Sequence, residues 1–313
     1  MRGRVLDQTE RRIFVGALAL FLIGLIIGGG NLLRTQLIRV PSSGGVVTEA
    51  LVGTPKLINP LFAPLNDVDR DLSALIYSGL FRLNEAYEPV PDLVNRFRWT
   101  EDQKTLEVTL RQGVKFHDGE DLNADDVIFT FQALKNPNWR SPLQGGFQNV
   151  SVVRVDDLTI QFQLEDPDPQ FLHELTVGIL PSHIWSHVTD SGAQLADANI
   201  RPVGSGPYSV ASFTRDPNGS ILNYNLKRFE GYYGIKPYIE EWRFRFFQDR
   251  ALAFSSLKNN QVDSLAFVPW EEANSLSEEQ FNRVNLELPQ MTIAFFNLQD
   301  ALLEDDDLRE VLT

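Results

Sequence analysis

Residues 13–27, close to the N-terminus, contain no polar side chain. The apolar character continues to Leu33, and the 21 residues from Ile13 to Leu33 would span about 31 Å as an α-helix, close to the thickness of the membrane hydrocarbon. A buried core helix is the alternative, but a core helix normally keeps a polar face, which this stretch lacks. The run therefore predicts one transmembrane helix.

The charges around this run predict its orientation. Four arginines precede it and two follow it, so we expect the N-terminus in the cytoplasm and the C-terminal body outside, in the periplasm or at the cell surface. No A-x-A cleavage site follows, whereas a removed signal peptide usually offers small residues there. We therefore expect residues 1–45 to hold a cytoplasmic N-terminus, an uncleaved single-pass anchor in the cell membrane and a linker. A cleaved signal peptide is the alternative.

The composition excludes several classes of function. The chain has 28 Lys and Arg against 42 Asp and Glu, a net charge of −14, which argues against nucleic acid as a partner because phosphate backbones need a basic surface. Cysteine is absent, which excludes disulfides, Cys-ligated zinc, thiol catalysis and anchoring through a lipidated cysteine. The hydrophobic share of 43% is ample for a folded body.

Hydrophobic periodicity and capping residues predict a body of mixed helices and strands. Residues 105–111, for example, alternate apolar and polar side chains, as in a half-buried strand. The expected elements are strands at 46–52, 105–111 and 242–246, a hairpin over 152–164, and helices at 71–80, after an N-cap at Asn123, and from a cap at Asp249 to Leu257. Short strands mixed with helices indicate an α/β fold that is α+β in part.

No set of residues in the sequence completes a catalytic or metal site. His183 and His187 are spaced like zinc ligands on one helix face, but the glutamate that zincin motifs place after the first histidine is Ile184 here. We interpret the acidic stretch 117–126 as a turn and a helix cap, and 204–207 as a tight turn before a strand. No G-x-S-x-G nucleophile motif occurs. We therefore expect no metal, no cofactor and no enzyme activity.

Several stretches match one known family in the same order along the chain. The most specific is residues 110–119, LRQGVKFHDG. The others include 58–61 (INPL), 77–81 (YSGLF), 89–94 (PVPDLV), 124–127 (ADDV), 202–208 (PVGSGPY) and 232–237 (YYGIKP). Together they resemble the extracellular solute-binding proteins of peptide-type ABC importers, bacterial solute-binding protein family 5, which includes dipeptide, oligopeptide and nickel binders. The similarity covers nearly everything from residue 46 onward.

The resemblance implies a periplasmic-binding-protein-like fold of type II, in which two α/β lobes close on a ligand and an α+β domain is inserted into the first lobe. In this sequence, lobe one would comprise 46–70 and 173–290, and the inserted domain 71–172. Residues 291–313 resemble the strand that crosses to the second lobe and the beginning of that lobe. We expect most of the second lobe to be missing from this sequence.

The resemblance also implies a function and partners. The protein would be a membrane-anchored binding protein that captures peptides, or a similar small solute, and delivers them to the transmembrane subunits of an ABC permease. An anchored sensory or scaffold protein that keeps the binding fold without transport is the alternative. An anchored hydrolase is less consistent with the sequence, because no nucleophile and base are visible.

By the same resemblance, two segments are the best placed to contact a ligand. The candidate residues are Thr54, Pro55, Lys56 and Asn59 in a loop, and Thr292, Ala294 and Phe296 on the crossing strand. Backbone groups there would bind an extended ligand as a neighbouring β-strand would, without reading its side chains. For each residue, packing or turn formation is the alternative role.

Overall fold

The computed structural model describes residues 7–36, 42–278 and 280–285 together with 293, 295 and 297, and gives no side chains for 26–36. Its residues form two compact units, Met1–Ala266 and Phe267–Thr313. The smaller unit contains the helix α8, Trp270–Asn274. All other helices and strands given below belong to the larger unit.

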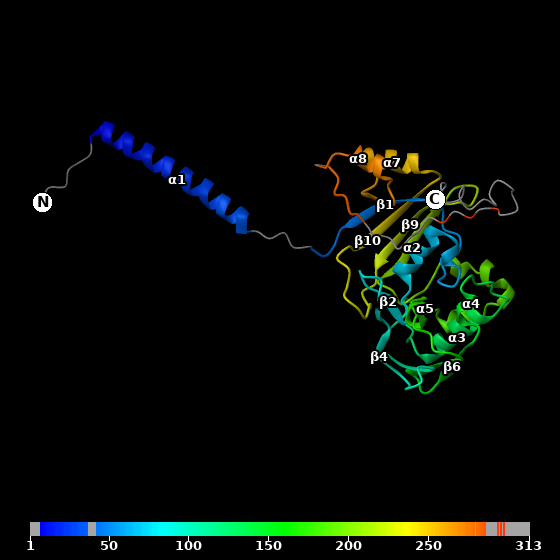
Figure 1. Cartoon of the computed structure of the whole chain (residues 1–313). Helices are drawn as coiled ribbons and strands as arrows, with labels where there is room; N and C mark the ends of the chain where they lie inside the picture. The colour runs from blue at the N-terminus through cyan, green and yellow to red at the C-terminus, as the bar shows by residue number, and fades with distance from the viewer. Residues whose placement is uncertain are drawn as a thin grey trace, which may run out of the picture. The chain divides into compact units, whose positions relative to one another are not determined.

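The N-terminal helix α1 runs from Gln8 to Gln36 and covers the apolar stretch (Figure 1). The apolar side chains that are described, up to Leu25, are exposed; Leu20, for example, is 72% exposed. Across the residues that the structure describes, no helix is long and apolar enough to cross a membrane. The transmembrane helix predicted for residues 13–33 is therefore not supported by the structure.

A five-stranded sheet forms one half of the larger unit. Its strand order is β11-β1-β10-β9-β8; Figure 1 labels β1, β10 and β9 of this sheet. The strands are β1 Val46–Val52, β8 Tyr208–Arg215, β9 Ile221–Arg228, β10 Glu241–Phe247 and β11 Ser264–Leu265. β1 pairs in parallel with β10 and β11, whereas β9 is antiparallel to both β10 and β8. The strands predicted at 46–52 and 242–246 are thus confirmed.

Helix α2, Asp67–Ile76, contributes Leu72 and Ile76 to the core that also contains Leu51 of β1. It begins at Asn66, whose side-chain oxygen accepts the N–H of Val68 at 3.1 Å. The helix predicted at 71–80 therefore exists but starts and ends four residues earlier. The prediction followed the apolar stripe and missed the cap, since a cap satisfies the first free N–H groups regardless of where the apolar residues begin.

Helix α7, Arg250–Lys258, begins and ends as the sequence predicts. The side chain of Asp249 accepts the N–H of Leu252 at 2.9 Å. After the helix, Asn260 has a φ of 54°, a left-handed conformation that asparagine tolerates better than most residues. Both ends of the helix are therefore set by local side chains.

A second sheet has the order β4-β5-β7-β6 and is antiparallel throughout. Its strands are β4 Val94–Trp99, β5 Thr105–Leu110, β6 Val150–Arg154 and β7 Thr159–Leu164. Leu106, Val108 and Leu110 are buried, so the alternating strand is confirmed, as is the hairpin formed by β6 and β7. A small hairpin of β2, Phe81–Leu83, and β3, Pro89–Pro91, precedes this sheet.

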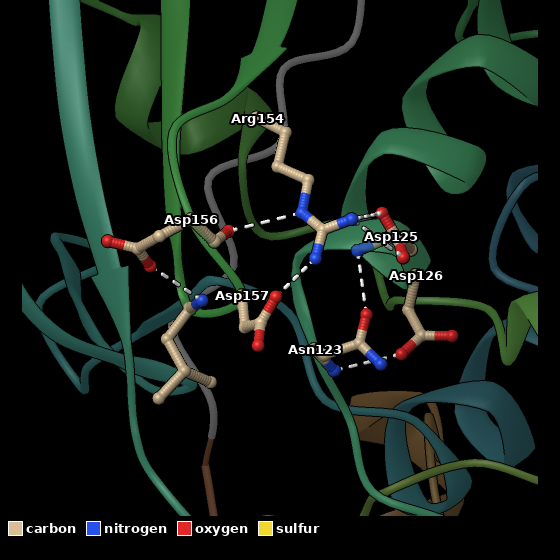
Figure 2. Close-up of polar contacts among 7 residues, drawn as sticks. Asn123, Asp125, Asp126, Arg154, Asp156 and Asp157 are labelled. Carbon is tan, nitrogen blue, oxygen red and sulfur yellow. Dashed lines mark hydrogen bonds and ion pairs between the residues drawn. The ribbon is translucent and has the colours of Figure 1, made fainter.

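Helix α3, Ala124–Lys135, starts at the predicted cap Asn123. The side chain of Asn123 accepts the N–H of Asp125 at 2.8 Å, and Asp126 accepts the N–H of Asn123 at 2.9 Å, which completes a capping box. Figure 2 shows Arg154 of β6 beside this cap, with its guanidinium bound to Asp125 and Asp157. The acidic stretch thus serves a turn and a helix start, as predicted.

The shorter helices are α4 Gln144–Phe147, α5 Phe171–Glu174 and α6 Ser182–Trp185, with 3₁₀ turns at Ala63–Leu65, Asp190–Leu195 and Asp197–Asn199. Because α6 ends at Trp185, His187 lies outside it, and the prediction that His183 and His187 share a helix face is wrong. His183 instead places its Nε2 2.7 Å from the carboxylate of Asp118.

His117 lies between β5 and α3 and connects that segment to the residues that precede β8. Its Nδ1 accepts the N–H of Gly204 at 3.2 Å, so its Nε2 carries the proton and donates to the carbonyl of Gly206 at 3.0 Å. Burial lowers the pKa of His117 to about 4, which keeps the ring neutral at physiological pH. The neutral histidine holds the turn at 204–207 that leads directly into β8, and this turn is confirmed.

Candidate binding site

The predicted ligand loop after β1 is held by its own side chains. The carboxylate of Asp69 accepts the backbone N–H groups of Lys56 and Leu57 at 2.8 and 2.9 Å, and the amide of Asn66 donates to the carbonyl of Thr54 at 2.9 Å. Pro55 is buried, whereas Lys56 is exposed. These backbone groups of the loop are therefore already engaged within the protein. The exposed Lys56 side chain and the half-buried Thr54 side chain are what the loop can offer to a solute.

Asn59 has a role within the loop. Its side chain is fully buried, and its Oδ1 accepts the N–H of Leu61 at 2.9 Å. Its backbone carbonyl accepts from Phe62 and Ala63. Asn59 therefore shapes the turn after the loop and presents no side-chain surface to a solute. The other predicted ligand contacts, Thr292, Ala294 and Phe296, lie outside the described residues.

A pocket of about 540 Å³ opens beside this turn. Four segments line it: residues 60–64 after Asn59, residues 70–77 of α2 and its end, residues 142–147 around α4, and residues 173–178 around α5. Its apolar lining comes from three prolines, two alanines, a leucine, a valine, Tyr77 and Phe147. A concave, mostly apolar surface with a few polar groups is the usual form of a small-solute site.

Three residues that line this pocket have a buried polar side-chain atom without a hydrogen-bond partner among the described residues, and one of these atoms is the hydroxyl of Tyr77. The Nδ1 of His173 and the Oε2 of Glu174 are both buried and have no hydrogen-bond partner among the described residues. Burial, with a smaller effect from Asp168, raises the pKa of Glu174 above its usual range. A buried polar atom without a partner costs free energy, and these atoms are closed off from solvent.

Two glycines allow the walls of the pocket to approach each other. A Cβ on Gly146 of α4 would lie 2.7 Å from Oε1 of Glu174, and a Cβ on Gly178 would lie 2.6 Å from the Cβ of Tyr77. Any larger residue at either position would displace the facing side chain. The glycines therefore leave the space that the Glu174 carboxylate and the end of α2 occupy.

A second pocket of about 540 Å³ lies along β8, where Arg201, Asp118 and residues 209–213 line it. Its polar groups already have protein partners: Asp118 binds His183, and Arg201 pairs with Asp197 at 3.3 Å. The pocket beside α2 is therefore the better candidate for solute binding. Its lining from α4 and α5 was not predicted, because no motif in the sequence connects the segments near residues 60, 145 and 175.

Comparison with known proteins is consistent with binding. The family model "Bacterial extracellular solute-binding proteins, family 5 Middle" matches residues 88–313. The dipeptide-binding protein of Escherichia coli is 29% identical, over 90% of this chain and 56% of that protein. The oligopeptide-binding protein AppA of Bacillus subtilis is 25% identical, over 87% of this chain and 50% of the length of AppA. The chain thus spans about half the length of these relatives.

Solved structures show the same fold. The structure of Bacillus subtilis AppA with a nonapeptide matches 71% of this chain and 44% of the AppA chain, with a TM-score of 0.66 and 25% identity. That of NikZ from Campylobacter jejuni with Ni(L-His) matches 85% and 52%, with a TM-score of 0.69 and 25% identity. These neighbours have the mixed α/β fold of type II periplasmic binding proteins. Because the family model covers most of the chain, the protein belongs to the bacterial extracellular solute-binding proteins of family 5, which bind solutes and are not enzymes.

Proposed function

We propose that this chain is the ligand-capturing part of an extracytoplasmic solute-binding protein that serves an ABC importer and takes peptides or similar small solutes. The observation that carries the proposal is the pocket beside α2, a concave surface whose lining combines apolar side chains with a few polar ones. The relatives add support, because they are named for dipeptide and oligopeptide binding and one neighbour holds a nonapeptide. Delivery of the solute to a permease is part of the same proposal.

We also propose that residues 46–70 and 173–290 form lobe one and that 71–172 form the inserted domain. The division has support in the sheets, since β1 and β8–β11 come from the first set and β4–β7 from the second. In this arrangement the pocket would lie between lobe one and the inserted domain. Thr54 and Lys56, together with Thr292, Ala294 and Phe296, are then proposed contacts for the part of a solute that extends beyond the pocket.

The proposal is tested by filling the pocket. Ala74 is an exposed residue of α2 that lines the pocket, so Ala74→Phe adds a ring there without disturbing the core. We expect the full chain to bind tri- and tetrapeptides in an NMR titration and Ala74→Phe to bind them at least about tenfold more weakly, a loss of about 1.4 kcal/mol.

The matched control is Ala251→Phe, which introduces the same ring at an exposed position of α7 outside the pocket lining. It should leave peptide binding unchanged. The proposed site is rejected if Ala74→Phe binds peptides as well as the unsubstituted chain does, and the proposed function is rejected if the unsubstituted chain binds none.

Attachment to the membrane through residues 13–33 is a further part of the proposal, and the apolar run of the sequence is what supports it. Expressed in a bacterium, the full chain should stay in the membrane fraction after a carbonate wash. A variant that lacks residues 13–27 should be released by the same wash. N-terminal sequencing separates an anchor from a signal peptide: a new N-terminus between residues 30 and 45 would show that the segment is removed.

A further inference from the structure

The loop that joins β9 to β10, residues 229–240, carries the most exposed large apolar side chain of the described residues. Ile235 is 95% exposed, and Tyr238, three residues later, is 57% exposed. Single exposed apolar side chains are common and need no explanation by themselves. The contacts of this loop with the linker that follows α1 indicate what covers these two.

The loop is held in a defined conformation by buried and half-buried polar groups. The guanidinium of Arg228, at the end of β9, donates to the carbonyl of Pro237 at 3.2 Å. The hydroxyl of Tyr233 donates to the carboxylate of Asp92 at 2.7 Å. The exposed apolar side chains therefore belong to an ordered loop that is bonded to the body on both sides.

The linker from α1 joins the body at this same loop. The hydroxyl of Ser43 accepts a hydrogen bond from Arg228 at 2.7 Å, and the N–H of Gly44 donates to the carbonyl of Tyr238 at 2.7 Å. β1 begins two residues later, at Val46. The chain therefore enters the body beside the exposed side chain of Tyr238.

The length of the linker limits how far this loop can be from the end of α1. Helix α1 ends at Gln36, and the bond from Arg228 fixes Ser43 to the loop. Seven residue steps span at most about 25 Å even when fully extended. With residues 13–33 in a membrane, as proposed above, the loop is close enough to the membrane surface to touch it.

The side chains of the loop suit the boundary between lipid headgroups and hydrocarbon. Isoleucine is stabilised by burial in hydrocarbon, and the amphipathic ring of tyrosine is enriched at this level of a membrane. The carboxylate of Glu230 on the same loop is paired with Arg228 at 2.9 Å and with Lys236 at 3.0 Å. Because the whole chain has a net charge of −14, apolar contact and not attraction to anionic lipid would hold the loop on the membrane.

We infer that residues 235–238 form a membrane-contact surface, in which Ile235 and Tyr238 insert at the headgroup boundary of the bilayer that holds α1. The inference rests on the proposed attachment through residues 13–33 and goes beyond it, because it gives the body a second contact with the membrane. Two contacts, one through α1 and one through the loop, determine which side of the body faces the lipid.

The absence of cysteine from the chain allows a label at one known position. The full chain, labelled with the fluorophore NBD at Tyr238→Cys, is reconstituted into phosphatidylcholine vesicles with or without a nitroxide on the lipid close to the headgroup. The nitroxide should quench about half of the fluorescence or more, since interfacial side chains insert to a depth of about 5–10 Å. A label at Leu195→Cys, where the native side chain is 88% exposed at the end of a 3₁₀ turn, should not be quenched.

A second pair of variants tests the role of the apolar side chain itself. Ile235→Asp, introduced into the chain that is labelled at residue 238, should remove the quenching. Leu195→Asp in the same labelled chain is the matched control and should leave the quenching unchanged. Both native side chains are almost fully exposed, so neither substitution affects the core.

Each other outcome overturns a defined part of the inference. Equal quenching at residues 238 and 195 would show that the body lies on lipid without a preferred surface, and a label at residue 238 that is shielded from water but not quenched would show a protein partner or a second copy there. Both results overturn the membrane-contact surface, and the attachment stands as long as the chain remains in the vesicles after a carbonate wash. Release of the chain by that wash would overturn the attachment and the inference together, while the peptide titration above still decides the binding function.

Discussion

Replacing Gly204 with alanine is expected to destabilise the larger unit by about 3 kcal/mol or more, in the range of severe overpacking. A Cβ at this position would lie 2.1 Å from the carbonyl oxygen of Ile76 and 2.8 Å from its carbon. Both are backbone atoms at the last residue of α2, so no side-chain rotation can relieve the contact. Either the helix end or the turn at 204–207 must move.

That movement would break several bonds at once. The N–H of Gly206 donates to the same carbonyl of Ile76 at 2.8 Å, and Gly204 itself binds His117 through both its N–H and its carbonyl. These bonds hold the end of α2, from which Tyr77 lines the pocket. We therefore expect Gly204→Ala to weaken peptide binding as well as stability.

Urea unfolding measures the effect. Gly145 provides the control, because a Cβ there meets nothing within 4 Å, and an alanine in α4 should be neutral or stabilising by up to about 1 kcal/mol. If Gly204→Ala unfolds at the same urea concentration as the unsubstituted chain, the distance between Gly204 and the carbonyl of Ile76 is larger than the structure shows.

The elements that sequence patterns predicted correctly are those set by neighbouring residues. The strand β5 alternates in its own sequence, the hairpin of β6 and β7 closes over a few residues, and Asp249 caps α7 from the adjacent position. The helix α2 was misplaced by four residues because an apolar stripe locates the middle of a helix, and the cap at Asn66 locates its start.

The candidate site could not be assembled from sequence for a different reason. The carboxylate that occupies the N–H groups of Lys56 and Leu57 belongs to Asp69, more than ten residues further on and on a helix whose start was misplaced. The pocket joins residues near 60, 145 and 175, and only the tertiary fold brings such distant segments together. The resemblance to the family predicted the fold, but the residues that line this pocket are not among its matching motifs apart from those near 60 and 77.

Glu49 gives the protein a stability that depends on pH near neutrality. It lies in β1, paired in register with Phe244 of β10 and Ser264 of β11. Burial, reinforced by the negative charge of Asp71 on α2, raises its pKa from 4.5 to about 7. The folded protein therefore holds a proton on Glu49 at a pH where the unfolded chain has released it.

The direction of the pH dependence follows from this shift. Because the pKa is higher in the folded state, the stabilisation is complete below about pH 4.5 and is lost as the pH rises through 7. His117 acts in the opposite sense: its pKa is lowered from 6.5 to about 4, so its effect is a loss of stability as the pH falls between those values. The two windows overlap, so between about pH 4.5 and 6.5 the two opposite effects on stability largely offset each other.

Glu49→Gln isolates the contribution of the carboxylate, since glutamine keeps the shape and cannot ionise. At pH 8 we expect this variant to be more stable than the unsubstituted chain by between about 1 and 3 kcal/mol. The upper value is the full pKa shift at about 1.36 kcal/mol per pKa unit, and the lower value allows for partial exposure of the side chain. The difference should shrink as the pH falls and vanish below about pH 4.5, where Glu49 is protonated in both the folded and the unfolded state. Urea unfolding at a series of pH values measures both, with the exposed Glu85→Gln as a control that should show no such trend. The prediction is wrong if the difference in free energy of unfolding between Glu49→Gln and the unsubstituted chain stays constant from pH 5 to pH 8. That result would mean that Glu49 has the same pKa in the folded and unfolded states.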